Sequence, residues 1–202
     1  KYPNIFVVAD EIYEHINFSG TFCSIASIPG MFEKTITVNG VAKAFAMTGW
    51  RIGYIGAPEF IAKACTKMQG QVTSGANSIA QRATIAAVEA DPKVLNYMVD
   101  AFHKRRDLVV GLIQDIPGLK INVPEGAFYV FPDVSYYFNK TLKGTLIKDA
   151  SDLAMYILAE ANVATVTGEA FGNPDCLRLS YATSEEQLTE AFRRIKLALI
   201  EK

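Results

Sequence analysis

Three short runs of apolar residues in the first sixty positions predict buried strands. They are IFVVA (5–9), TITV (35–38) and IGYIG (52–56), with irregular or helical segments between them. A continuous apolar run of this length is typical of a strand covered on both faces, because a half-exposed strand alternates apolar and polar residues. We therefore expect these runs to form a buried sheet.

Apolar residues at helical spacing predict three helices in the middle of the chain. The first follows Pro58, and the second follows the loop TSGANS (73–78) and extends to about Glu89. The third and longest begins near Pro92, and Pro117-Gly118 ends it. This long amphipathic helix is the expected hinge between two subdomains, divided near residue 92.

Beyond the long helix the pattern changes to short strands and helices. A helix is expected near 151–161, and a capping box formed by Thr183 and Glu186 is expected to open the last helix. Leu188, Phe192, Ile195 and Leu199 form the predicted buried stripe of that helix. The expected strands are AFYVF (127–131), VATV (163–166) and CLRLSY (176–181).

Composition narrows the classes of partner. The 202 residues are 50% hydrophobic and 20% charged with a net charge of −1, which argues against nucleic acid and against an anionic membrane as partners. No apolar run reaches the ~18–20 residues needed to span a bilayer. The three cysteines are scattered and the two histidines are isolated, so we expect no metal site and a reduced, cytoplasmic compartment.

Three charged residues follow or precede the predicted strands. Asp10 follows the first run, Lys43 lies between apolar residues after the second, and Arg51 begins the third. Ligands of open α/β sheets collect at the carboxyl ends of parallel strands, where a carboxylate could meet one. Apolar flanks would favour the neutral, nucleophilic form of the Lys43 amine, and a guanidinium could hold a phosphate or carboxylate. Each residue also has an ordinary structural interpretation: a turn aspartate, a solvated lysine and a structural ion pair.

Taken in order, the motifs resemble those of a known family. Asp10-x-x-Tyr13, Asn39-Gly40-x-x-Lys43 and TGWRIG (48–53) are similar to the cofactor motifs of fold type I pyridoxal-phosphate enzymes, the class I and II aminotransferases, and are closest to the bacterial aspartate aminotransferase subgroup. Matches to the family's small domain are GAFYVF (126–131), VTGEAFG (166–172) and LRLSYATSEE (177–186).

The resemblance implies an α/β fold in two parts. Residues 1–92 would form the C-terminal part of the large pyridoxal-phosphate-binding domain, with a mostly parallel sheet. Residues 93–202 would form the small α+β domain together with the long linking helix. The chain opens at Lys1 without an initiator Met or a signal peptide and enters the run 5–9 almost at once. We therefore expect that it begins inside a larger protein and that the family's N-terminal half is absent.

The resemblance also implies a role for five residues. Lys43 would hold the aldehyde of pyridoxal 5′-phosphate as a Schiff base and move a proton during the reaction. Asp10 would pair with the pyridine nitrogen, Tyr13 would hydrogen-bond the phenolic oxygen, and Arg51 would bind the phosphate. Arg178 would bind the α-carboxylate of the substrate. The serines that many relatives carry just before the lysine are replaced here by Val41 and Ala42, so one phosphate contact departs from the pattern.

The activity that follows from the resemblance is transamination, in the full-length parent protein, between an L-amino acid, with aspartate as the expected donor, and 2-oxoglutarate. The isolated fragment is expected to be inactive. The loop 73–78 resembles one that reaches the cofactor phosphate of a neighbouring subunit, which implies a homodimer with shared active sites. The alternatives are an aromatic or alanine aminotransferase, a carbon–sulfur lyase, a transcription regulator with an aminotransferase-like domain, and a catalytically silent fragment.

Overall fold

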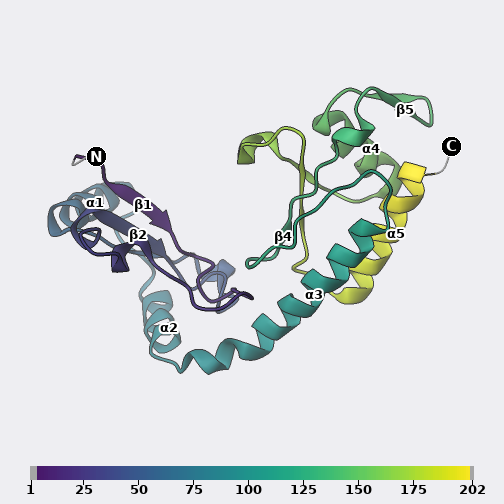
Figure 1. Cartoon of the computed structure of the whole chain (residues 1–202). Helices are drawn as coiled ribbons and strands as arrows, with labels where there is room; N and C mark the ends of the chain where they lie inside the picture. Colours follow the sequence, from purple (N-terminus) through teal and green to yellow (C-terminus); the bar gives the residue numbers. More distant parts are fainter. Residues whose placement is uncertain (1–3, 201–202) are drawn as a thin grey trace. The chain divides into compact units, whose positions relative to one another are not determined.

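A computed structural model describes residues 4–200 of the chain, which form two compact units, Lys1–Val99 and Asp100–Lys202 (Figure 1). The opening residues Lys1, Tyr2 and Pro3, on which the expectation about the start of the chain partly rests, lie outside the described residues. The division falls inside helix α3 (Asn96–Gln114), later in the chain than the predicted boundary at residue 92.

The first unit is built on a three-stranded sheet in the order β1-β2-β3, where β1 is Val7–Asp10, β2 is Thr35–Asn39 and β3 is Tyr54–Gly56. β1 and β2 are parallel, and β3 is antiparallel to β2. The carboxyl ends of β1 and β2 therefore lie at one edge of the sheet, and β3 begins at that same edge.

The prediction that these strands are buried is wrong for the described residues. The side chains of Ile5, Val8 and Ile55 are 55%, 69% and 39% exposed, whereas Ala9 is buried. A strand of continuous apolar residues needs neighbours on both sides and cover on both faces. Within residues 4–200, β1 is hydrogen-bonded to β2 alone, and the face that carries Val8 is left in contact with solvent.

Two helices follow the sheet, as predicted. They are α1 (Glu59–Val72) and α2 (Ser78–Val88). The Asn77 side chain begins α2, because its Oδ1 accepts hydrogen bonds from the backbone N–H groups of Ile79 and Ala80 at 2.9 and 3.0 Å. A short 3-10 turn, η4 (Pro92–Leu95), then leads into α3.

The second unit packs helices against a small antiparallel sheet. The sheet has the order β4-β8-β7, where β4 is Tyr129–Val130, β8 is Leu177–Ser180 and β7 is Val166–Thr167, so the strand predicted at 163–166 begins only at its last residue. A separate antiparallel hairpin, formed by β5 (Lys140–Leu142) and β6 (Thr145–Ile147), comes between β4 and β7 along the chain. Helices α4 (Ala150–Ala161) and α5 (Glu185–Ile200) contact each other, and the Tyr156 hydroxyl donates to the backbone oxygen of Ala198 at 2.8 Å.

The cap of α5 is displaced by one residue from its prediction. The Oγ of Ser184, not of Thr183, accepts from the backbone N–H of Gln187 at 3.3 Å. Ser184 and Gln187 have the same three-residue spacing as the predicted pair, but the described contacts include only this half of the capping box, and the Thr183 hydroxyl donates to Gln187 Oε1 instead. The buried stripe of α5 is confirmed; its members are Leu188, Phe192, Ile195 and Leu199.

Two buried tyrosines give the second unit a pH dependence. Burial raises the pKa of Tyr137 and of Tyr181 to about 12, and their hydroxyls donate to the backbone oxygens of Pro117 and Ala127. Because these pKa values exceed the ordinary value of 10.0, the folded state keeps the protons that an unfolded tyrosine loses. The associated stability is complete below pH 10 and is lost as the pH rises toward 12.

We expect the free energy of unfolding to fall between pH 10 and pH 12, and to fall less steeply in Tyr181→Phe than in the wild type. Urea unfolding at several pH values measures the slope. Tyr97→Phe is the control, because Tyr97 is 78% exposed, and it should keep the wild-type slope. Equal slopes for Tyr181→Phe and the wild type would contradict the assignment.

Candidate active site

The three charged residues that the sequence singled out in the first unit lie along one edge of the sheet. Asp10 is the last residue of β1 and is opposite Val38 of β2. Lys43 follows the end of β2 at Asn39, and Arg51 precedes Tyr54, the first residue of β3, which is opposite Asn39. The strand pairing thus brings together residues from three separate segments of the sequence.

Lys43 is held by buried neighbours on both sides. Val41 is fully buried and Ala44 is 3% exposed, whereas the Lys43 side chain between them is only half-buried. The turn closes through hydrogen bonds from the N–H of Phe45 to the oxygen of Val41 at 3.3 Å and from the N–H of Ala46 to the oxygen of Lys43 at 3.2 Å. The apolar residues Val41 and Ala44 are therefore packed in the core, and their packing fixes the position of the Lys43 backbone.

Tyr13 and Asp10 lie on the turn that leaves β1. The Lys43 Nζ lies 5.8 Å from the centre of the Tyr13 ring, so the amine and the phenol are neighbours. One Asp10 oxygen, Oδ1, accepts from the backbone N–H of Ile12 at 3.3 Å, which is the turn interaction expected of an aspartate. Its other oxygen accepts no hydrogen bond from residues 4–200, and the side chain is exposed. The carboxylate can therefore hold the turn and still meet a ligand.

Arg51 has an unusual backbone conformation. It follows the 3-10 turn η3 (Thr48–Trp50) and has a φ of 54°, in the left-handed region that residues other than glycine rarely adopt. Its Nη1 donates to the backbone oxygen of Thr48 at 2.8 Å, and within the described part of the chain it forms no ion pair with a carboxylate. The structural ion pair considered from the sequence is therefore not found there. Non-glycine residues in this conformation cost about 1–3 kcal/mol and are frequent at ligand sites.

Two glycines allow the strand ends to approach closely. A Cβ added to Gly40 would lie 3.1 Å from the backbone oxygen of Ile52 and 3.2 Å from the Cα of Gly53, and one added to Gly53 would lie 3.3 Å from the oxygen of Asn39. Both distances at Gly40 are shorter than ordinary contacts. The glycines before Lys43 and after Arg51 therefore set the distance between the two segments that carry those residues.

The sequence did not predict the hydrogen bonds that connect the turn after β1 with Ser24 and with the end of β2. Glu11 is 8% exposed and accepts from the Ser24 hydroxyl at 2.7 Å. The Asn39 amide donates to Glu14 Oε1 at 2.7 Å, and its oxygen accepts from the N–H of Gly40, also at 2.7 Å. These contacts tie the turn after β1 to the end of β2. The sequence signal was the unusual density of acids in ADEIYEH (9–15).

Arg178 belongs to the second unit. It lies on β8 opposite Val166, with Leu177 and Tyr181 buried on the other face, as the alternation predicted. Its Cζ lies 4.5 Å from the centre of the Tyr129 ring and 4.1 Å from the centre of the Phe171 ring. Within residues 4–200 its guanidinium has neither a carboxylate partner nor a side-chain hydrogen bond.

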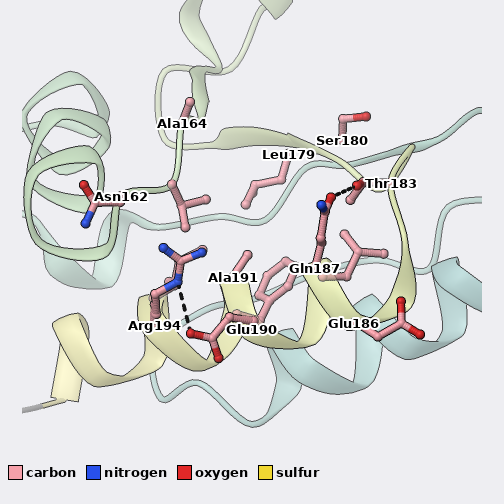
Figure 2. Close-up of a pocket in the computed structure, with 14 residues that line it drawn as sticks. Asn162, Ala164, Leu179, Ser180, Thr183, Glu186, Gln187, Glu190, Ala191 and Arg194 are labelled. Carbon is pink, nitrogen blue, oxygen red and sulfur yellow. Dashed lines mark hydrogen bonds and ion pairs between the residues drawn. The ribbon is translucent and has the colours of Figure 1, made fainter.

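Figure 2 shows a separate groove of about 520 Å³ in the second unit, lined by α5, β8 and the segment after α4. Arg194 and Glu190 on α5 line this groove and form an ion pair, with 3.4 Å between Arg194 Nε and Glu190 Oε1. Leu179 on β8 lines it as well. None of the five residues proposed from the sequence lines this groove. In the described part of the chain there is no cluster of three or more metal-ligand residues, and no helix is both long and apolar enough to cross a membrane.

The known proteins that this chain resembles are aminotransferases, both by sequence and by structure. The family model for aminotransferase class I and II matches residues 1–195. A bifunctional aspartate aminotransferase and glutamate/aspartate-prephenate aminotransferase from Petunia hybrida is 47% identical over 205 residues, which cover 99% of this chain and 43% of the relative.

Solved structures agree with that match. The crystal structure of the aspartate aminotransferase from Rhizobium meliloti has a TM-score of 0.93 at 43% identity, covering 98% of this chain and 50% of that one. An aromatic aminotransferase from Pyrococcus horikoshii OT3 has a TM-score of 0.87 at 37% identity, covering 97% of this chain and 51% of the other. The chain thus spans about half the length of these relatives, and over almost all of its own length it belongs to the class I and II aminotransferase family.

Proposed function

We propose that this chain takes part in pyridoxal 5′-phosphate-dependent transamination, in which an L-amino acid, aspartate foremost, gives its amino group to 2-oxoglutarate. The observation that carries the proposal is the set of amine, phenol, carboxylate and guanidinium groups along one edge of the sheet in a member of this family. The cofactor would supply an aldehyde that bonds to amines and a ring that accepts electrons from the substrate Cα.

The residues of the first unit suit that cofactor chemically. The Lys43 amine would hold the cofactor through its aldehyde, and its Nζ would be the group that takes up and releases the proton of the substrate Cα. Asp10 would keep the ring nitrogen protonated, because a nearby negative charge favours the pyridinium form. Tyr13 would hydrogen-bond the phenolic oxygen beside Lys43. Arg51 would bind the phosphate through the N–H groups that its contact with Thr48 leaves available.

Arg178 would bind the α-carboxylate of the substrate. Support comes from its guanidinium, which is half-buried against two rings and has no carboxylate partner among residues 4–200. Because all amino acids share the α-carboxylate, this residue would not select aspartate. The preference for aspartate is supported by the names of the relatives, which include aspartate and aspartate/prephenate aminotransferases. The same names disfavour a lyase or a regulator.

We also propose a cytoplasmic homodimer with shared active sites. The exposed loop at residues 73–78 supports it, because the family resemblance places such a loop at the cofactor phosphate of a neighbouring subunit. The cysteines Cys23, Cys65 and Cys176 are all free, and two of them are exposed, as suits a reducing compartment.

The first prediction concerns covalent attachment. Borohydride reduction of the cofactor-loaded full-length parent, followed by peptide mapping, should place the pyridoxyl group on Lys43, and Lys43→Ala should abolish the adduct. Lys34→Ala is the control and should keep the adduct on Lys43. Lys34 is also half-buried, and it lies at the opposite end of β2. A pyridoxyl group on any lysine other than Lys43 would contradict the proposal that Lys43 holds the cofactor.

The second prediction separates cofactor binding from chemistry. Arg51→Ala and Arg51→Gly should weaken cofactor affinity equally, by about 1.5–3 kcal/mol for one lost charge-assisted contact. Arg51→Gly should be the more stable of the two, because glycine adopts a φ of 54° without strain. Asp10→Ala should instead retain cofactor and lose most of kcat. Titration of the cofactor, thermal unfolding and steady-state kinetics measure the three quantities. The division of roles fails if Asp10→Ala turns over normally at saturating cofactor.

The third prediction concerns the substrate carboxylate. Arg178→Lys keeps the charge but loses the planar pair of donors, so kcat/KM should fall about ten- to a hundredfold. The loss should be equal for aspartate, glutamate and aromatic donors, and cofactor affinity should not change. A loss restricted to the dicarboxylic donors would mean that Arg178 recognises the substrate side chain instead.

A further inference from the structure

Two aromatic residues from different segments pack against the Arg178 guanidinium. Tyr129 comes from β4, and Phe171 ends the 3-10 turn η6 (Glu169–Phe171). Both ring centres lie within cation–π range of the arginine Cζ, at 4.5 and 4.1 Å. Such contacts attract the positive charge, and within residues 4–200 no side-chain or backbone acceptor is hydrogen-bonded to the guanidinium.

The sheet fixes the position of the Tyr129 ring. Tyr129 is directly opposite Ser180, so Arg178 is its diagonal neighbour on the same face of β8. Aromatic side chains reach diagonal neighbours in antiparallel sheets. The tyrosine therefore contacts the arginine because of strand register.

A tight turn fixes the position of the Phe171 ring. The Gly168 oxygen accepts from the N–H groups of Phe171 at 2.8 Å and Asn173 at 3.1 Å, and the Gly168 N–H donates to the Cys176 oxygen at 2.8 Å. A Cβ added to Gly168 would lie 2.2 Å from the Asn173 oxygen, so the turn requires glycine there. Gly172, with a φ of 84°, ends η6 directly after Phe171. The turn thus holds an aromatic ring that is itself 47% exposed.

We propose that Tyr129 and Phe171 are positioning residues, which hold the Arg178 guanidinium in the orientation that binds a carboxylate. This inference rests on the proposed role of Arg178. An arginine side chain has several rotatable bonds, and fixing such a side chain on binding lowers affinity. Rings that fix it beforehand remove that loss, and they do so without a carboxylate of the protein that would compete with the ligand.

The experiment observes Arg178 directly by NMR in the 202-residue chain, with propionate as the probe. Propionate has one carboxylate and no amine, so it reports carboxylate binding without any reaction. The Nε–Hε signal of Arg178 is assigned by its disappearance in Arg178→Lys. Phe171→Leu and Tyr129→Leu remove one ring each, and Phe171→Tyr and Tyr129→Phe keep an aromatic ring. Tyr136→Leu is the control, because Tyr136 is similarly exposed but stacks on Lys140.

We expect the Hε signal to be displaced by the ring currents in the wild type and to move toward its ordinary position in both leucine variants. The propionate Kd should rise about two- to tenfold in these variants, as expected when a long side chain must be ordered on binding. The two aromatic replacements and Tyr136→Leu should keep the wild-type Kd. In the cofactor-loaded full-length parent, Phe171→Leu should raise KM for aspartate and for an aromatic donor by one common factor, with little change in kcat.

The outcomes separate this inference from the proposed function. A wild-type Arg178 signal that responds to propionate, with an unchanged Kd in both leucine variants, overturns the positioning role alone. A wild-type signal that does not respond to propionate overturns the carboxylate role of Arg178 and this inference with it. Loss of affinity in Tyr136→Leu equal to that in Phe171→Leu would also overturn the positioning role, since the effect would not be specific to the rings at Arg178.

Discussion

The pairing of β2 with β1 on one side and β3 on the other is the constraint on which the candidate site depends. Asp10 is distant in sequence from Lys43 and Arg51, and the parallel register of β1 with β2 and the antiparallel register of β3 with β2 bring the segments that carry them to one edge. A slip of one residue in either pairing would turn every side chain of that strand to the opposite face. The close approach of Gly40 to Ile52 and Gly53 and the bond from Asn39 to Glu14 both act at this edge, where the register matters most.

Local pattern was sufficient to predict much of the second unit. The stripe of α5 is buried as its helical spacing predicted, and β8 presents Arg178 on the face opposite Leu177. These features depend on contacts within a short stretch or between neighbouring elements. The cap of α5 was misplaced by one residue because TSEEQ (183–187) offers two overlapping pairs with the same spacing, and side-chain geometry decides between them.

The first unit was predicted less well, for a physical reason. A run such as IFVVA reports how much apolar surface must be covered, but not which part of a protein covers it. The exposure of Val8, and of Phe60 on α1, shows that residues 4–200 do not cover it. The buried Glu11 and its bond to Ser24 were missed because a hydrogen bond between residues thirteen positions apart leaves no periodic signal in the sequence. Likewise, the left-handed backbone of Arg51 cannot be read from TGWRIG, since the glycines beside it are the residues that usually adopt that conformation.

The two candidate arginines, one in each unit, are positioned by neutral groups, and this has a consequence for their chemistry. Arg51 is fixed by a backbone oxygen, and Arg178 by two rings, with no carboxylate paired to either within residues 4–200. An ion pair would position an arginine equally well, but it would also neutralise the charge and occupy the donors that a phosphate or carboxylate needs. Neutral supports give an orientation that salt screens little, while attraction to an anionic ligand remains sensitive to ionic strength. Salt should therefore weaken the binding of anions at these arginines without disturbing the geometry that receives them.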